Sequence, residues 1–175
     1  MAEKPKNKTN TAQQQPNEAK ANGQGNDKAP LFRLAGQFVA DLSFECPKAP
    51  TMLDPQQKNN LEFTFGLDSK RIEGDMYEVA LTLKGNNQSP DKKPVYLIEL
   101  RYTGVFELKN IPKEQMRPLL AVEAPALIYP FARQKFMSAI MDSGFRPPML
   151  DPINFHALYT QAQEQQQQAK EAPKQ

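Results

Sequence analysis

The chain has 175 residues and a formal net charge of +2, and this length fits one domain with tails or two very small domains. Residues 30–160 hold 15 basic and 15 acidic side chains, so this region lacks the basic surface of a nucleic-acid-binding protein, and we expect no nucleic-acid partner. The single cysteine, Cys46, excludes an intramolecular disulfide.

The first 29 residues contain no Val, Ile, Leu or aromatic residue and are built mainly from Lys, Asn, Gln, Ala, Pro and Gly. Because such a segment cannot offset its ordering entropy by apolar burial, we predict a disordered tail over 1–29. It lacks the apolar region of a signal peptide, and no run of about 18 apolar residues occurs in the chain, so we expect a cytoplasmic protein without stable membrane insertion. The folded domain is expected at 30–160 and a second, Gln-rich tail at 161–175.

The first half of the domain alternates between apolar and polar residues, as half-buried strands do. Strands are expected at 38–45, around 63–67 and 79–83, and at 95–102. In the first, one side is predicted to hold Phe38, Ala40, Leu42 and Phe44, and the other Val39, Asp41, Ser43 and Glu45. In the fourth, one side is predicted to hold Ile98, Leu100 and Tyr102, and the other Leu97, Glu99 and Arg101. The turn-rich breaks at 48–55, 69–75 and 85–94 are short, which predicts one four-stranded antiparallel sheet.

After Asn110 the apolar residues follow a helical period. A helix is predicted to begin at Pro125 or Pro130 and to run to Asp142, with Gly144 as the residue after its end. It carries more apolar residues than one buried stripe needs, so we expect the sheet to cover one side and a second copy of the protein the other. A stiff, Pro-rich connector over 144–152 precedes a last helix near Asn154. Strands followed by two main helices predict an α+β fold.

No residues suggest catalysis or metal binding. His156 is the only histidine and has no cysteine nearby in the sequence, so we interpret it as a surface helix residue and predict no metal site. Cys46 precedes Pro47 without a visible activating base, so it is expected to be a small apolar filler. Glycine-rich phosphate loops and nucleophile elbows do not occur. We therefore predict a protein that is not an enzyme and needs no cofactor.

Apolar residues in the connector and the helices remain as functional candidates. Most are expected to form the core and subunit contacts. Some could instead line a groove for apolar segments of another chain, since Met adapts its shape and aromatic side chains supply large contact areas. Our hypothesis places such a groove between the sheet and the helices, lined by Phe65, Tyr77, Phe106, Phe145 and Phe155.

Five segments together resemble the SecB family of bacterial protein-export chaperones in their order and spacing. They are Asp41-Leu-Ser-Phe-Glu-x-Pro-x-Ala-Pro50, Gly104-x-Phe-x-Leu-x-Asn-Ile-Pro112, Pro118-Leu-Leu-x-Val-Glu-Ala-Pro-x-Leu-Ile-Tyr-Pro-Phe-Ala-Arg133, Gly144-Phe145 and Pro152-Ile-Asn-Phe-x-Ala-Leu-Tyr159. The resemblance covers roughly residues 32–160, which is nearly all of the expected domain.

The resemblance implies a homotetramer, a dimer of dimers, that binds unfolded preproteins without ATP and delivers them to the SecA motor. It also implies an acidic SecA-binding surface on the exposed side of the sheet, at the matching positions Asp41, Glu45, Leu97 and Glu99. The plain alternative for these residues is a solvated polar face.

Two other functions stay open. The first is a SecB-like chaperone with a client outside export, such as a labile antitoxin, in which the acidic face would be dispensable. The second is a protein that binds a small hydrophobic ligand, which would need a closed pocket of fixed shape. The acidic face therefore separates export from the other chaperone task.

Overall fold

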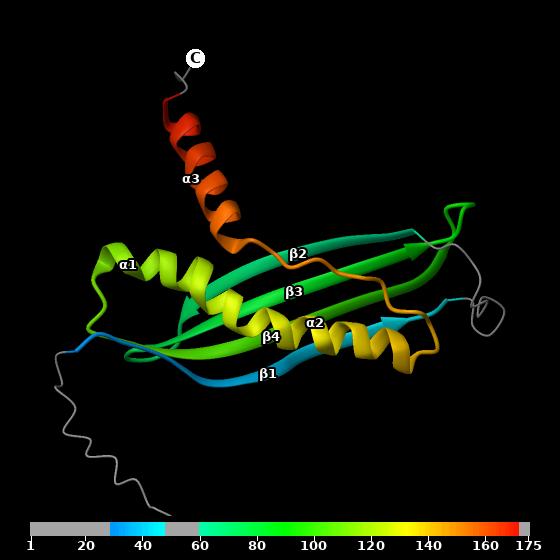
Figure 1. Cartoon of the computed structure of the whole chain (residues 1–175), viewed down its shortest axis with the longest axis horizontal. Coiled ribbons are helices and arrows are strands. Elements are labelled where there is room, and N and C mark those ends of the chain that lie inside the picture. The colour runs from blue at the N-terminus through cyan, green and yellow to red at the C-terminus, as the bar shows by residue number, and fades with distance from the viewer. Residues whose placement is uncertain (1–28, 48–59, 172–175) are drawn as a thin grey trace, which may run out of the picture.

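The computed structural model describes residues 29–47 and 60–171, so residues 1–28 of the predicted N-terminal tail and the predicted break at 48–55 lie outside the described residues. The described chain contains β1 (Leu31–Glu45), β2 (Asn60–Arg71), β3 (Met76–Gln88) and β4 (Pro94–Lys109). They form one antiparallel sheet in the order β1-β4-β3-β2, and helices lie across one of its faces (Figure 1). The predicted α+β fold with a four-stranded antiparallel sheet is confirmed.

The strands are longer than predicted, and two predicted breaks are correspondingly narrower. Residues 69–71 belong to β2, and residues 85–88 belong to β3. Gly85 was interpreted as part of a turn, but it lies in β3, where close packing leaves no room for a side chain. A Cβ at this position would lie 3.0 Å from Cζ of Phe136 and 2.9 Å from Cγ2 of Ile98. Gly85 therefore stays in the strand because a ring from the helical layer packs against its backbone.

The predicted alternation of the first strand is wrong at its beginning. The pairing of β1 with β4 shifts by one residue between Val39 and Asp41, which marks a bulge at Ala40. Because a bulge reverses the alternation, Phe38 lies opposite Thr103 and shares the open face of the sheet with Asp41. After the bulge the predicted pattern holds, with Leu42 and Phe44 on the helical side.

The helical region begins earlier than predicted. It starts with α1 (Lys113–Pro118), continues through the π-helical segment η1 (Leu119–Glu123) and ends with α2 (Ala124–Asp142). Proline was taken as the start signal, yet Pro118 closes α1 and Pro125 lies in the first turn of α2, so each stands where the helix type changes. The N–H of Ala124 donates to the carbonyl of Leu119, five residues back. This wider π-type turn lets the helix continue between two residues that lack an N–H donor.

The end of α2 and the start of the last helix are confirmed. Gly144 has a φ of +83°, its N–H donates to the carbonyl of Met141, and the N–H of Phe145 donates to that of Ile140. This pair of bonds is the Schellman ending that the glycine predicted. The connector then leads to α3 (Phe155–Glu171), where Asn154 Oδ1 accepts the N–H of Ala157 at 3.0 Å. α3 continues past residue 161, where the predicted Gln-rich tail begins, and projects from the body (Figure 1).

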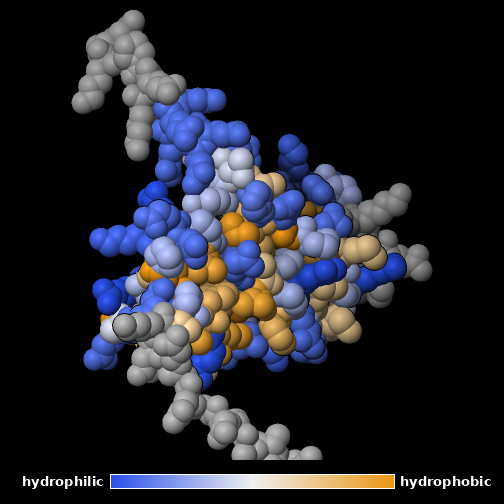
Figure 2. All heavy atoms as spheres, turned by 60° about the vertical axis from the view of Figure 1, so that its left-hand side comes forward, coloured by the Kyte–Doolittle hydropathy of each residue, from blue (hydrophilic) through white to orange (hydrophobic). Residues whose placement is uncertain are grey.

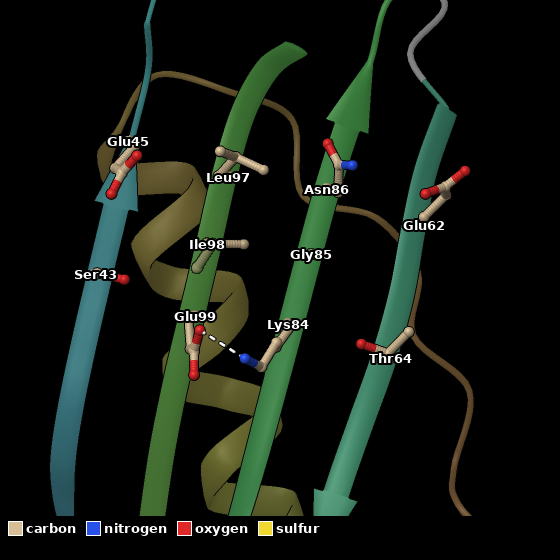
Figure 3. A pocket seen from close by; sticks show the side chains of 10 residues that line it. All are labelled: Ser43, Glu45, Glu62, Thr64, Lys84, Gly85, Asn86, Leu97, Ile98 and Glu99. Carbon is tan, nitrogen blue, oxygen red and sulfur yellow. Dashed lines mark ion pairs between the residues drawn. The ribbon is translucent and has the colours of Figure 1, made fainter. Parts of the chain in front are cut away.

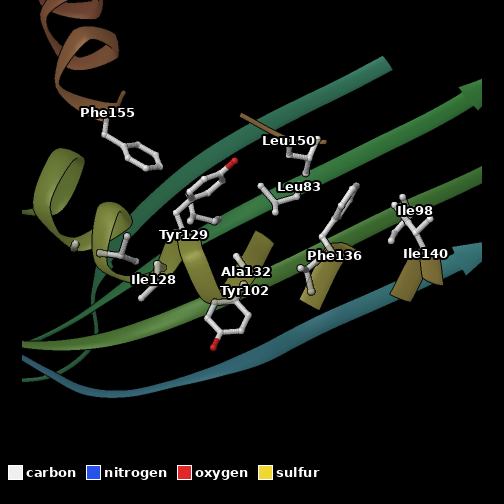
Figure 4. Packing of buried hydrophobic residues seen from close by; sticks show 14 of the residues in the cluster. Leu83, Ile98, Tyr102, Ile128, Tyr129, Ala132, Phe136, Ile140, Leu150 and Phe155 are labelled. Carbon is white, nitrogen blue, oxygen red and sulfur yellow. The ribbon is translucent and has the colours of Figure 1, made fainter. Parts of the chain in front are cut away.

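The core lies between α2 and the sheet (Figure 4). Residues four apart on one side of α2 are completely buried: Ile128, Ala132, Phe136 and Ile140. They pack on the inward residues of the central strands, among them Leu83 and Ile98. Burial of one such large side chain contributes about 1.5–3 kcal/mol. The described helices cover only one face of the sheet. The opposite face and the outer side of α2 are therefore available for contacts with other molecules.

Candidate functional site

The uncovered face of the sheet brings the four predicted SecA-binding residues together. Glu45 on β1 pairs directly with Leu97 on β4, and Asp41 and Glu99 lie on the same face in neighbouring rows. Glu45, Leu97 and Glu99 line a surface hollow of about 370 Å³ (Figure 3). β2 and β3 add side chains to this hollow that were not predicted: Glu62, Thr64, Lys84 and Asn86. We call the hollow together with Asp41 the acidic face.

The acidic face carries more carboxylates than cations. Nζ of Lys84 lies 2.9 Å from Oε2 of Glu99, and this is the ion pair drawn in Figure 3. Arg101 also lies on this side of the sheet, but its guanidinium contacts Asp68 and Glu78 at 3.2 and 3.5 Å. Within residues 29–47 and 60–171, no ion pair neutralises Asp41, Glu45 or Glu62. The surface is therefore suited to contact a positively charged partner.

A second candidate surface is an apolar groove between β2 and the connector. The groove has a volume of about 470 Å³. Its walls are Leu61, Phe63 and Phe65 from β2 and residues 148–153 from the connector. Phe65 is 36% exposed and Met149 is 89% exposed. Large apolar side chains that stay open to water can gain free energy when another chain covers them.

One hydrogen bond holds the connector in place beside this groove. The hydroxyl of Tyr129 on α2 donates to the carbonyl oxygen of Asp151 at 2.8 Å. Burial raises the pKa of Tyr129 above its ordinary value of 10.0, so this hydroxyl remains a donor to a higher pH than that of an exposed tyrosine. The connector wall is thereby tied to the rigid helical layer.

The five residues predicted for a groove do not form one surface. Phe65 lines the groove described above, and Phe155 contacts it edge-on, with ring centroids 6.3 Å apart. Phe155 is itself almost buried and borders a neighbouring hollow at the start of α3. Phe145 lies beyond the other end of α2, where it packs on Tyr96 with ring centroids 4.9 Å apart. Tyr77 is half-buried on β3.

Phe106 was predicted as a groove residue, and the structure contradicts this. Its side chain is 0% exposed and stacks on Phe32 with ring centroids 5.5 Å apart. It is core within a single protomer. The alternation of the fourth strand points Phe106 to the same side as Ile98 and Leu100, but alternation alone does not separate the centre of a covered face from its margin.

Sequence reasoning did not assign most of the residues that form the groove. They are Leu61, Phe63, Pro148, Met149, Leu150 and Ile153. The connector residues could have been predicted from the sequence, because apolar residues between prolines cannot enter a regular helix and so tend to stay at the surface. The contribution of β2 depended on which strand forms the edge of the sheet, and this follows from the topology.

The outer side of α2 is a third apolar surface. Spacings of four and three residues alternate along an outward-facing stripe made of Leu127, Phe131, Gln134, Ser138 and Met141. Leu127, Phe131 and Met141 are exposed large apolar side chains. This spacing is the pattern with which one helix packs along another. Figure 2 turns the side of the molecule that carries α1 and α3 toward the viewer, and hydrophobic side chains gather in the middle of this view, below the polar α3.

His156 and Cys46, the candidate metal ligand and nucleophile, do not form a catalytic or metal site with other described residues. His156 is exposed on α3. Sγ of Cys46 lies 3.4 Å from the carbonyl oxygen of Val95 and donates to it. In the described ranges, no three His, Cys, Asp or Glu side chains are placed to hold a metal ion. No helix formed by those residues is long and apolar enough to cross a membrane.

Comparison with known proteins identifies the relatives of this chain. The family described as preprotein translocase subunit SecB matches residues 25–167. The protein-export protein SecB of Nitrobacter hamburgensis is 37% identical over 146 residues, covering 83% of this chain and 91% of the relative. The SecB of a Rhodopseudomonas palustris strain is 40% identical over 142 residues, covering 79% of this chain and 88% of the relative.

A solved structure supports the fold independently. The SecB-like chaperone of Mycobacterium tuberculosis, solved in complex with a ChAD peptide from an antitoxin, matches with a TM-score of 0.60 and 12% sequence identity. The match covers 70% of this chain and 90% of that chain. At this identity the likeness concerns the fold alone.

Proposed function

This chain belongs to the SecB family, and from this premise we propose that it is an ATP-independent export chaperone of the cytoplasm. It binds unfolded precursor proteins, keeps them competent for translocation and delivers them to the SecA motor. Relatives named as protein-export proteins at 37–40% identity over most of their length support this function.

The observation that carries the proposal is the open apolar groove between β2 and the connector. Phe65 and Met149 present apolar surface to water at opposite walls of the groove. An unfolded precursor exposes apolar side chains that can cover this surface, with about 1.5–3 kcal/mol for each large side chain that becomes fully buried. A folded protein hides the same side chains. Selectivity for the unfolded state therefore requires no nucleotide.

The openness of the groove also favours a polypeptide over a small ligand. Its two walls come from an edge strand and a connector, and it is open to solvent rather than enclosed. An extended segment can enter such a groove along its length. A small hydrophobic molecule would leave much of its own surface in water, which weakens binding.

We place a second copy of the chain on the outer side of α2. The stripe from Leu127 to Met141 has the spacing for helix packing along its full length, and none of the described residues of the same protomer covers it. Among the strands that the structure describes, β1 is an edge strand with no neighbour on its outer side, so that side can pair with another strand. Two self-complementary surfaces on one protomer are what a dimer of dimers requires. Several grooves in one tetramer would hold a long client through high effective concentration.

The acidic face is proposed as the SecA-docking surface, with Asp41, Glu45, Leu97 and Glu99 as its contacts. Exposed charges of this kind mainly set the association rate and the salt dependence of binding. The variant Glu45→Lys is expected to weaken SecA binding and to leave the oligomer intact. Unchanged affinity in low-salt calorimetry would exclude this role, and export would then give way to a chaperone with another client.

The proposed function is tested with one secretory precursor that is chemically unfolded and then diluted. Light scattering follows its aggregation in the presence of the protein, and the same precursor in its folded form is the control. Suppressed aggregation, together with no complex with the folded form, is the expected result. If scattering is unchanged at a molar excess of the protein, the chaperone function is wrong.

A further inference from the structure

We propose that Lys84 is an internal competitor on the acidic face: by pairing with Glu99 it weakens the attraction of this surface for a cationic partner. The proposal rests on the proposed SecA docking and adds a residue that sets its strength. It commits to a partner segment that presents Lys or Arg side chains.

The position of Lys84 is set by strand register. It lies directly opposite Glu99 on the neighbouring strand, between Thr64 on β2 and Ser43 on β1 in the same row of the sheet. Both flanking residues are neutral. Within the described part of the chain, Glu99 is the one acidic residue that forms an ion pair with Lys84, and the distance is 2.9 Å. Figure 3 shows the ammonium directed toward Glu99 across the hollow.

The charge count shows what this pair does to the surface. The hollow is lined by three carboxylates, from Glu45, Glu62 and Glu99, and by one cation, Lys84. A cationic side chain that enters the hollow meets Lys84 as a like charge and must share or displace it to reach Glu99. Leu97 is 36% exposed, lies between the carboxylates of Glu45 and Glu62, and can cover the alkyl stem of an incoming Lys or Arg. The hollow thus suits a basic side chain that Lys84 partly excludes.

The pair contributes little to the fold, which makes its removal a clean test. The side chains of Lys84 and Glu99 are 56% and 43% exposed. Ion pairs between side chains this exposed are screened by water and salt and usually have a small effect on stability. Replacement of Lys84 should therefore change the charge of the surface without changing the structure.

Lys70 provides a matched control. It is an exposed lysine on the same face, directly opposite Glu78 on the neighbouring strand, and its Nζ lies 3.2 Å from Oε2 of Glu78. It does not line the hollow. The variants Lys84→Gln and Lys70→Gln each remove one lysine charge from a lysine–glutamate pair, and Glu78 keeps its ion pair with Arg101 when Lys70 is replaced. Only the first removes it from the acidic face.

Binding of SecA to the full-length variants is measured by calorimetry at several salt concentrations. Lys84→Gln is expected to tighten binding by about twofold to fivefold at low salt, the size of one exposed charge–charge interaction. It should also steepen the salt dependence. Lys70→Gln is expected to stay close to the unmodified protein. The effect of Lys84→Gln should be smaller in a Glu99→Gln background, because the competition for Glu99 is then absent.

The proposal is overturned if Lys84→Gln leaves the affinity unchanged or weakens it, or if Lys70→Gln tightens binding equally, because net charge alone would then explain the result. A parallel titration with an oligolysine peptide separates this proposal from the docking proposal. If SecA does not bind the unmodified protein, SecA docking is wrong. The order of the variants toward oligolysine still decides the role of Lys84.

Discussion

Truncation of Met149 gives the sharpest test of the groove. This side chain is 89% exposed in the free protein, so nearly all of its apolar surface is available to a client. Because full burial of a Met side chain is worth about 1.5–3 kcal/mol, complete coverage would contribute at most about 1.3–2.7 kcal/mol. The upper limit for Met149→Ala is therefore a loss of about tenfold to hundredfold in affinity. Phe65 is only 36% exposed, and the same reasoning allows about twofold to sixfold for Phe65→Ala.

The assay is binding of a fluorescently labelled, unfolded precursor, with Kd measured for each variant at one salt concentration. Ile72→Ala is the matched control, because Ile72 is also apolar and 52% exposed but does not line the groove. Circular dichroism and thermal unfolding check that Met149→Ala keeps the fold, which is expected since the side chain is so exposed.

The order of the affinity losses shows whether the client binds in the groove. Met149→Ala should weaken binding most, Phe65→Ala less, and Ile72→Ala least. Equal effects of Met149→Ala and Ile72→Ala would show that the protein holds clients by unspecific apolar surface. No effect of Met149→Ala would place the client elsewhere.

Three further predictions concern the frame around these surfaces. Gly104→Ala should lower the free energy of unfolding by about 1–3 kcal/mol in denaturant titrations, because its Cβ would lie 2.8 Å from Cγ2 of Ile128; Gly66→Ala, with its nearest atom 3.9 Å away, should cost much less. Phe131→Glu should reduce the oligomer seen in sedimentation to a smaller species that keeps its circular dichroism spectrum, and an unchanged mass would contradict the placement of a second copy on α2. Hydrogen bonds from Lys109 and Arg33 lower the pKa of Glu107 below its ordinary 4.5, so the stabilisation is present above that value and lost as pH falls through the lower pKa of the folded state. Lowering the pH from 6 to 3 should therefore reduce the free energy of unfolding of the unmodified protein more than that of Glu107→Gln. Parallel pH dependences of the two proteins would contradict this prediction.

The central sheet could be predicted because its side-chain alternation coincides with burial. Val79, Leu81 and Leu83 follow the two-residue period and are completely buried under the helical layer. Asp41 and Glu45 share a face for the same reason, which brought the proposed docking residues together. The helix end at Gly144 could be predicted because a residue in the left-handed region at a helix end is usually glycine.

The rest depended on interactions that a local pattern does not contain. The bulge at Ala40 depends on the register with β4, so Phe38 was assigned to the wrong face. Pro125 predicted a helix start, but a π-helical turn let the helix begin at Lys113. Phe65 and Phe106 both look like strand aromatics, yet Phe65 is on an edge strand and Phe106 is on a central strand under α2. Exposure in a sheet follows strand order, which alternation does not determine.

Site-specific photo-cross-linking to an unfolded precursor tests directly whether the groove between β2 and the connector holds unfolded chains. The cross-linking amino acid p-benzoylphenylalanine replaces Met149 in one variant and Ile72 in a second, and the folded precursor serves as the control. Cross-links are expected from position 149 to the unfolded precursor and not to the folded one, with few from position 72. Cross-links that are equally frequent from both positions, or equally frequent to the folded form, would contradict a groove that selects unfolded chains.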